Sequence, residues 1–133
     1  MKIINKLLIK VFYIANLVLM VFYLYPGSLL GCFLYNDCYV QPLITRNFMI
    51  SSNYSISSNH FYAFFILSTL GIFTYRNTKK IKFLITYLFL LSIVLELFHL
   101  IIPSRGFEWS DLFGNIFGLI FVIVVYEVKN RYA

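Results

Sequence analysis

Four apolar runs, separated by polar segments of unequal length, dominate the pattern of the chain. They cover about residues 7–25, 58–75, 83–102 and 109–126. Each is close to the ~20 residues that a helix needs to cross a hydrocarbon core of ~30 Å. The pattern predicts one domain over residues 1–133. Its predicted fold is all-α, an integral membrane bundle of about four transmembrane helices.

The first apolar run has a second interpretation, as a cleaved signal peptide. Basic residues precede it, and the small residues Gly27 and Ser28 follow it. However, the run is longer and more aromatic than the apolar core of a typical signal peptide, and Pro26-Gly27-Ser28 is a poor cleavage site. We expect the run to be retained as a span, and a three-span chain is the alternative.

Composition supports a membrane environment. Hydrophobic residues make up 61% of the chain and charged residues only 12%. A soluble domain of this length needs more charge to cover its surface. The 15 Phe and 11 Tyr are typical of lipid-facing and interfacial positions.

The net charge of +6 is better explained by membrane topology than by nucleic-acid binding. The basic residues form short clusters between apolar runs, without a basic stripe, so no nucleic-acid partner is expected. In a four-span topology only Arg46 and Arg105 fall on one side. The other nine are Lys2, Lys6, Lys10, Arg76, Lys79, Lys80, Lys82, Lys129 and Arg131. The positive-inside rule then predicts cytoplasmic termini in a multi-pass protein of the cell membrane.

The segment 26–57 is predicted to be a long external loop, with a short interfacial segment around Leu29–Tyr35. It contains the only two cysteines, Cys32 and Cys38. An oxidising compartment permits a disulfide between them, across a short loop that can close. Two unpaired thiols near the membrane surface are the alternative, and we expect the bridge.

Polar residues near the external ends of the helices are the candidates for a site. Glu96 lies inside an apolar run, where an ionised carboxylate costs ~2.5 kcal/mol or more unless it faces protein or water. His99 follows on the same helical face, and Asp111 and Asn115 share a face of the last helix. The candidates are His60, Glu96, His99, Arg105, Asp111 and Asn115. We expect them to converge near the outer surface, with His60 at the edge and Arg105 paired with Glu96.

The spacing of these residues resembles that of the VanZ-like family of small membrane proteins. Seven positions carry the resemblance: Glu96, His99, Pro103, Arg105, Asp111, Asn115 and Gly118. His60-Phe-Tyr-Ala63-Phe64 is also similar to that family's His-Phe-x-Ala-Phe/Tyr segment. The match covers about the second half of the chain.

The chain departs from the family pattern at three places. His99 stands where Gln is usual, and Val122 stands where a second small residue is common. Ile56 and Ser57 replace an Asp-Lys pair, so a partner recognised through that pair need not be shared. The family is named after a protein linked to teicoplanin resistance, and its molecular activity is not established. The resemblance implies a role at the cell envelope, in glycopeptide tolerance or surface glycan handling.

Three functional interpretations of the candidates are open. They bind an anionic lipid-linked or glycan ligand, because Arg suits phosphate oxygens. Alternatively, Glu96, His99 and Asp111 perform acid–base catalysis in a small membrane enzyme. The third interpretation is structural, with an ion pair that clamps the turn and Asp111 near a helix N-cap. Binding is favoured over catalysis, membrane lipid is the expected partner, and the oligomeric state is not predicted. No cofactor or metal is expected, because no His/Cys cluster has ligand spacing.

Overall fold

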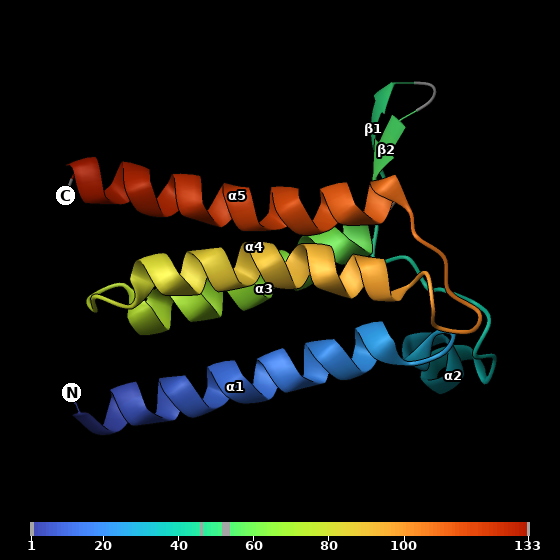
Figure 1. Ribbon diagram of the computed structural model, residues 1–133, viewed down its shortest axis with the longest axis horizontal. Helices are drawn as coiled ribbons and strands as arrows, with labels where there is room; N and C mark the ends of the chain where they lie inside the picture. The colour runs from blue at the N-terminus through green and yellow to red at the C-terminus, as the bar shows by residue number, and fades with distance from the viewer. Residues whose placement is uncertain (1, 46, 52–53, 133) are drawn as a thin grey trace.

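A computed structural model describes residues 2–45, 47–51 and 54–132 (Figure 1). The described chain is mostly helical. Its four long helices are α1 (Lys2–Leu24), α3 (Ser58–Tyr75), α4 (Ile81–Phe98) and α5 (Trp109–Tyr132). They alternate in direction along the bundle, so both ends of the chain lie at one end of it (Figure 1).

Three described helices are long and apolar enough to cross a membrane. They are the Asn5–Leu24 part of α1, α4 and α5. The central helix α3 does not meet this criterion, although its bounds match the prediction. Its first turn is polar, with Ser58, Asn59 and His60. The structure therefore supports a helical membrane protein and three of the four predicted spans.

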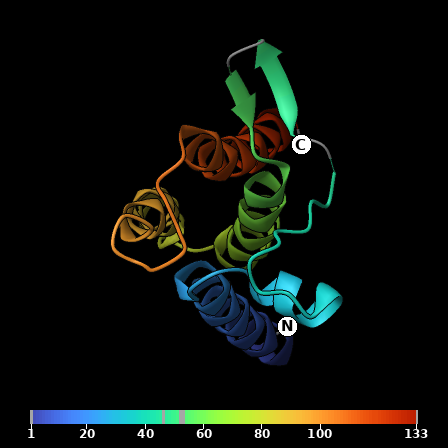
Figure 2. The ribbon, with the colours of Figure 1, turned by 90° about the vertical axis from the view of Figure 1, so that its right-hand side faces the viewer.

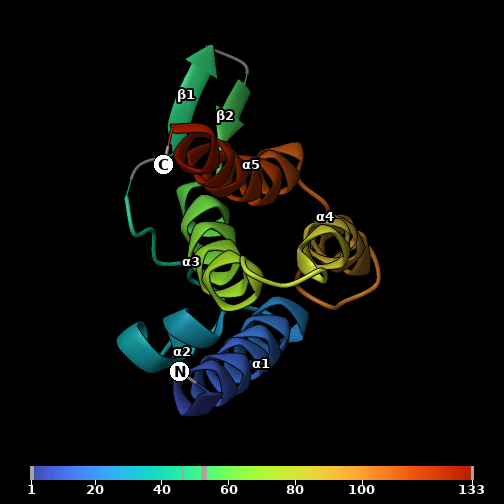
Figure 3. The ribbon, with the colours of Figure 1, turned by 90° about the vertical axis from the view of Figure 1, so that its left-hand side faces the viewer.

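Helix α3 is the centre of the bundle. It packs against α1, α4 and α5, as the end-on views show (Figures 2 and 3). Its inward face contributes Phe64 and Leu67 to the hydrophobic core, where they meet Leu88, Leu95 and Leu119 from the neighbouring helices. Burial against protein explains how this helix is stable with fewer apolar residues than the others.

Two glycines let α5 approach α3 closely. A Cβ added at Gly114 would lie 2.6 Å from the carbonyl oxygen of Ser57. A Cβ at Gly118 would lie 2.9 Å from the backbone nitrogen of Phe65, and it would also collide with the carbonyl oxygen of Phe61. This is the small-x-x-x-small arrangement by which membrane helices bring their backbones together.

The segment 26–57 is more regular than the sequence predicted. The interfacial segment is a short helix, α2 (Leu29–Tyr35), whose N-cap Ser28 accepts a hydrogen bond from Gly31. Beyond it, β1 (Phe48–Ser51) and β2 (Tyr54–Ile56) form an antiparallel hairpin. The prediction of a loop without strands was wrong here, because serine and asparagine obscured the alternation of these short strands.

The two cysteines are joined by a disulfide. Cys32 lies in α2 and Cys38 follows it, with their Cα atoms 4.1 Å apart, inside the limit of about 7 Å for a bridge. The carbonyl oxygen of Cys38 also accepts a hydrogen bond from the backbone of Ser28, at 2.7 Å. The disulfide and this hydrogen bond fix the segment after α2 against α2, at one end of the bundle.

Helix α4 ends four residues earlier than predicted, at Phe98 instead of residue 102. The next residues form tighter turns, in which Leu100 and Ile101 donate to carbonyls three residues back, at 3.1 and 3.0 Å. Pro103 has no N–H with which to continue the helix, and Ser104 has a left-handed φ of 61°. His99 consequently lies at the C-cap of α4, where the chain turns towards α5.

Candidate functional site

A polar cluster lies inside the bundle at the end that carries α2 and the hairpin. Two carboxylate–histidine pairs form its centre. Nδ1 of His60 lies 3.0 Å from Oδ1 of Asp111, and Nδ1 of His99 lies 3.3 Å from Oε2 of Glu96. The predicted convergence of residues from α3, α4 and α5 is thus present in the structure.

Glu96 is completely buried, and its two oxygens differ in their surroundings. Oε1 accepts a hydrogen bond from the backbone N–H of Glu108, at 3.0 Å, which ties the loop before α5 to α4. Oε2 has no hydrogen-bond partner among the described residues, although His99 is within ion-pair distance. Since an unsatisfied buried charge is costly, this oxygen needs a proton or a cation beside it.

The protonation of His99 follows from its second ring nitrogen. Nε2 lies 3.1 Å from the carbonyl oxygen of Tyr23, which can only accept a hydrogen bond, so Nε2 carries hydrogen. In a neutral ring, Nδ1 would then turn a lone pair towards Glu96. A hydrogen bond between the two side chains would therefore require a proton on one of the two facing atoms, Nδ1 of His99 or Oε2 of Glu96.

Tyr23 belongs to the cluster, and sequence reasoning did not select it. Its hydroxyl donates to Oδ1 of Asn115 at 2.5 Å, and the amide of Asn115 donates to the carbonyl of Ser92 at 3.4 Å. The Tyr23 ring also contacts those of His60 and His99, with centroids 5.0 and 5.8 Å away. The only sequence feature that pointed to Tyr23 was its position near the end of the first apolar run. Tyrosines are common at such membrane interfaces whether or not they belong to a site.

Arg105 does not pair with Glu96, so that prediction was wrong. Its guanidinium donates to the carbonyl oxygens of Phe22, at 3.0 Å, and Tyr25, at 3.3 Å. These carbonyls lie at the end of α1, where backbone acceptors are unpaired and the helix dipole attracts a cation. Partial burial lowers the pKa of Arg105, and nearby Asp111 opposes the shift. An arginine nevertheless stays charged at neutral pH.

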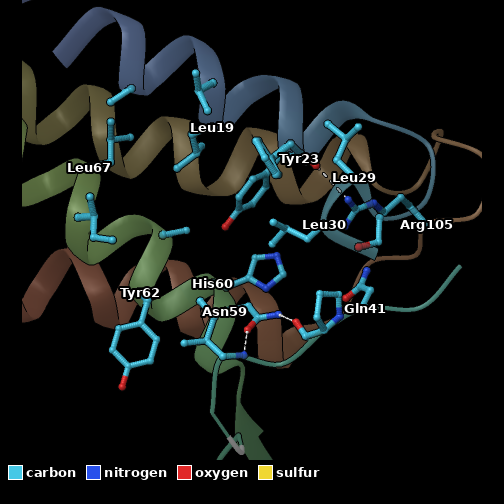
Figure 4. A pocket seen from close by; sticks show the side chains of 18 residues that line it. Leu19, Tyr23, Leu29, Leu30, Gln41, Asn59, His60, Tyr62, Leu67 and Arg105 are labelled. Carbon is cyan, nitrogen blue, oxygen red and sulfur yellow. Dashed lines mark hydrogen bonds between the residues drawn. The ribbon is translucent and has the colours of Figure 1, made fainter. Parts of the chain in front are cut away.

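His60 is central to the cluster, although the sequence placed it at the edge. Besides Asp111, its Nδ1 lies 2.9 Å from the hydroxyl of Ser57. Asp111 is in the first turn of α5, after the helix start, so it is not the N-cap residue, but its charge still suits the helix dipole. The His60 ring also points towards a cavity (Figure 4).

The cavity has a volume of about 370 Å³ and lies between α1, α3 and the segment 28–44. Its wall between the helices is apolar and includes Ala15, Leu19, Ala63, Ile66 and Leu67. Its other end is polar, with Arg105, Gln41, Asn59 and His60 (Figure 4). The cavity is therefore amphipathic, and His60 connects it to the buried cluster.

Comparisons with known proteins found no relative of this chain. No protein-family model matches it, and no curated protein or solved structure matches it. The resemblance to the VanZ-like family accordingly depends on residue spacing. Function has to be inferred from the chemistry of the cluster and the cavity.

Proposed function

We propose that the chain is a VanZ-like multi-pass protein of the cell membrane that binds the anionic head group of a lipid or lipid-linked glycan. The observation that carries this proposal is the amphipathic cavity with Arg105 at its polar end. A role in glycopeptide tolerance or surface glycan handling is drawn from the family resemblance alone.

The guanidinium of Arg105 has N–H groups left with which to bind such a ligand. Its hydrogen bonds to Phe22 and Tyr25 use two of the five N–H groups, which leaves three within the described part of the chain. Those bonds also hold the side chain in place. A fixed, planar donor of this kind suits the paired oxygens of a phosphate.

The rest of the cavity fits the apolar part of a lipid. The side chains of Leu19, Ile66 and Leu67 line it between α1 and α3. A hydrocarbon chain placed there would replace lipid contacts with protein contacts, while Gln41 and His60 would face the head group (Figure 4). Ligand sites commonly combine an apolar wall with a few polar groups in this way.

The proposed topology places the cavity in the outer leaflet. Helix α3 would be the fourth span, enclosed by α1, α4 and α5. The clustered basic residues lie in the segments at the end of the bundle where the chain begins and ends (Figure 1). Arg105 lies at the opposite end, where it binds the carbonyl oxygens of Phe22 and Tyr25 at the end of α1. Arg46, which entered the charge count, lies outside the described residues. Cytoplasmic termini follow from the positive-inside rule.

Cysteine labelling tests this topology. Gly106→Cys is expected to react in intact cells with a reagent that does not cross membranes, because a Cβ at Gly106 has no atom of the described chain within 4 Å. Asn77→Cys, in the turn between α3 and α4, is the matched control and should react only after lysis. The reverse pattern would contradict the proposed orientation.

Arg105→Gln tests the ligand. We expect it to weaken binding of short-chain phosphatidylglycerol to the purified, detergent-solubilised protein by about tenfold or more, because a charge-assisted hydrogen bond contributes ~1.5–3 kcal/mol. The control is Arg131→Gln, which removes an equal charge from an exposed position in the last turn of α5. Equal dissociation constants for the two variants would refute the proposed site.

A membrane enzyme acting on a lipid-linked precursor is the second candidate. The close approach of the Glu96 carboxyl group to the His99 imidazole favours it, since such pairs take part in acid–base catalysis. Burial disfavours it, because Glu96 and His99 are 0% and 1% exposed, so a substrate in the cavity would reach His60 first. Turnover of a lipid-linked precursor by the purified protein would favour the enzyme.

A further inference from the structure

We infer that the polar cluster is a binding site for a divalent metal ion, with His60, Glu96 and Asp111 as its protein ligands. Each residue offers one ligand atom, and these three atoms lie within 4.8 Å of one another. They come from α3, α4 and α5, so the ion would join three helices. This inference is independent of the proposed lipid binding.

The distances suit an ion after a small adjustment. Zinc takes ligands at ~2.0–2.2 Å, so neighbouring ligand atoms of a tetrahedral site are about 3.4 Å apart. His60 and Asp111 already approach to 3.0 Å. The third ligand atom, on Glu96, lies within 4.8 Å of the other two, so a small shift of its side chain that keeps the hydrogen bond from Glu108 would bring it in.

The unsatisfied oxygen Oε2 of Glu96 is a second, independent observation that favours a metal ion. Oε2 is buried and accepts no hydrogen bond from any described residue, whereas Oε1 is held by the backbone of Glu108. A metal ion would satisfy Oε2 directly. The bond to Oε1 would orient the carboxyl group, as partners of metal ligands commonly do.

The charges that face the cluster also favour a cation. Glu96 and Asp111 bring two carboxyl groups to the cluster, and the imidazoles of His60 and His99 face them. Arg105 interacts electrostatically with Asp111 and Glu96, but its hydrogen bonds go to the carbonyl oxygens of Phe22 and Tyr25. An ion of charge +2 would balance the two carboxylates, which are otherwise costly to bury.

The donor set favours zinc. One imidazole and two carboxylates make three protein ligands, which leaves a fourth position open, as in catalytic zinc sites. Because His60 also lines the cavity, a water molecule that enters from the cavity would take that position. Sequence reasoning expected no metal, because the ligands are far apart in the chain and only the packing of three helices unites them.

The direct test measures zinc on the purified full-length protein in detergent. After chelation and dialysis against zinc, elemental analysis is expected to find about one zinc per chain. Addition of Zn²⁺ to the stripped protein should raise its melting temperature by about 5 °C or more, whereas Mg²⁺ should not. Fewer than about 0.1 zinc per chain would overturn the inference.

Variants assign the ligands. Asp111→Asn and Glu96→Gln preserve side-chain size, and each is expected to reduce bound zinc by about tenfold or more. Glu127→Gln is the control, since it removes a carboxylate from an exposed position near the end of α5. Zinc that persists at one per chain in both site variants would place the ion elsewhere and refute the assignment. The stoichiometry of the wild-type protein decides the matter if a variant does not fold.

Discussion

Gly118→Ala is expected to lower the melting temperature of the solubilised protein by about 10 °C, through a loss of about 2–3 kcal/mol. The added Cβ would collide with the carbonyl oxygen of Phe61 and lie 2.9 Å from the backbone nitrogen of Phe65. Backbone atoms of a packed helix cannot rotate away. The two helices would have to separate along their closest contact.

Two glycines provide matched controls. Gly106→Ala should change the melting temperature little, because no atom of the described residues lies within 4 Å of its added Cβ. Gly71→Ala should have an intermediate effect, because its Cβ would meet the ends of the flexible Phe12 and Leu84 side chains, at 2.9 and 3.2 Å. Equal stability of the Gly118 and Gly106 variants would show that α3 and α5 are not packed as described.

Separation of α3 from α5 would also affect the polar cluster. His60 lies on α3 and Asp111 on α5, and their contact depends on the same approach, because a Cβ at Gly114 would lie 2.8 Å from the Cβ of His60. Gly114→Ala is therefore expected to reduce both stability and zinc binding. The glycines of α5 therefore affect both the packing of α3 against α5 and the geometry of the polar cluster.

Glu96→Leu is expected to destabilise the protein by about 2–3 kcal/mol, although leucine is more apolar and fills a similar volume. The substitution would leave the backbone N–H of Glu108 without its acceptor and would remove the group that faces Nδ1 of His99. Each buried polar group that loses its partner costs about 1–3 kcal/mol. Unfolding of the purified protein in mixed micelles with increasing denaturing detergent measures the loss.

Glu96→Gln is the matched variant and should be nearly as stable as the wild type in the absence of metal. Its amide oxygen can accept from Glu108, and its NH₂ group can donate to the free nitrogen of a neutral His99. The variant keeps the contacts and removes the charge. If leucine and glutamine destabilise the protein equally, the hydrogen bonds described here do not stabilise the fold.

Much of the helical architecture was readable from the pattern of apolar residues. The bounds of α3 and the start of α5 match the predicted runs, and α2 coincides with the predicted interfacial segment. These features are local, because apolar length and breakers such as Pro26 and Pro103 act within the segment itself. The hairpin was missed, because its short strands are stabilised by contact with each other and with α5.

The helical spacing also indicated which residues share a face. Glu96 with His99 and Asp111 with Asn115 were placed correctly, since positions three and four apart are neighbours on any helix. Partners on other segments could not be read in this way. Arg105 is the cation nearest to Glu96 in sequence, yet its guanidinium binds the end of α1, some 80 residues away along the chain.

The sequence by itself determined that the chain is mostly helical, with helices long and apolar enough to span a membrane and polar groups gathered at one end, because hydropathy and helical period are properties of neighbouring residues. Only the tertiary structure decided how these groups combine. It brought Tyr23 to Asn115, exposed the carbonyls of α1 to Arg105, and placed His60, Glu96 and Asp111 around one point. Such contacts depend on the distance and rotation between packed helices. In this protein, Gly114 and Gly118 of α5 permit the close approach of α5 to α3.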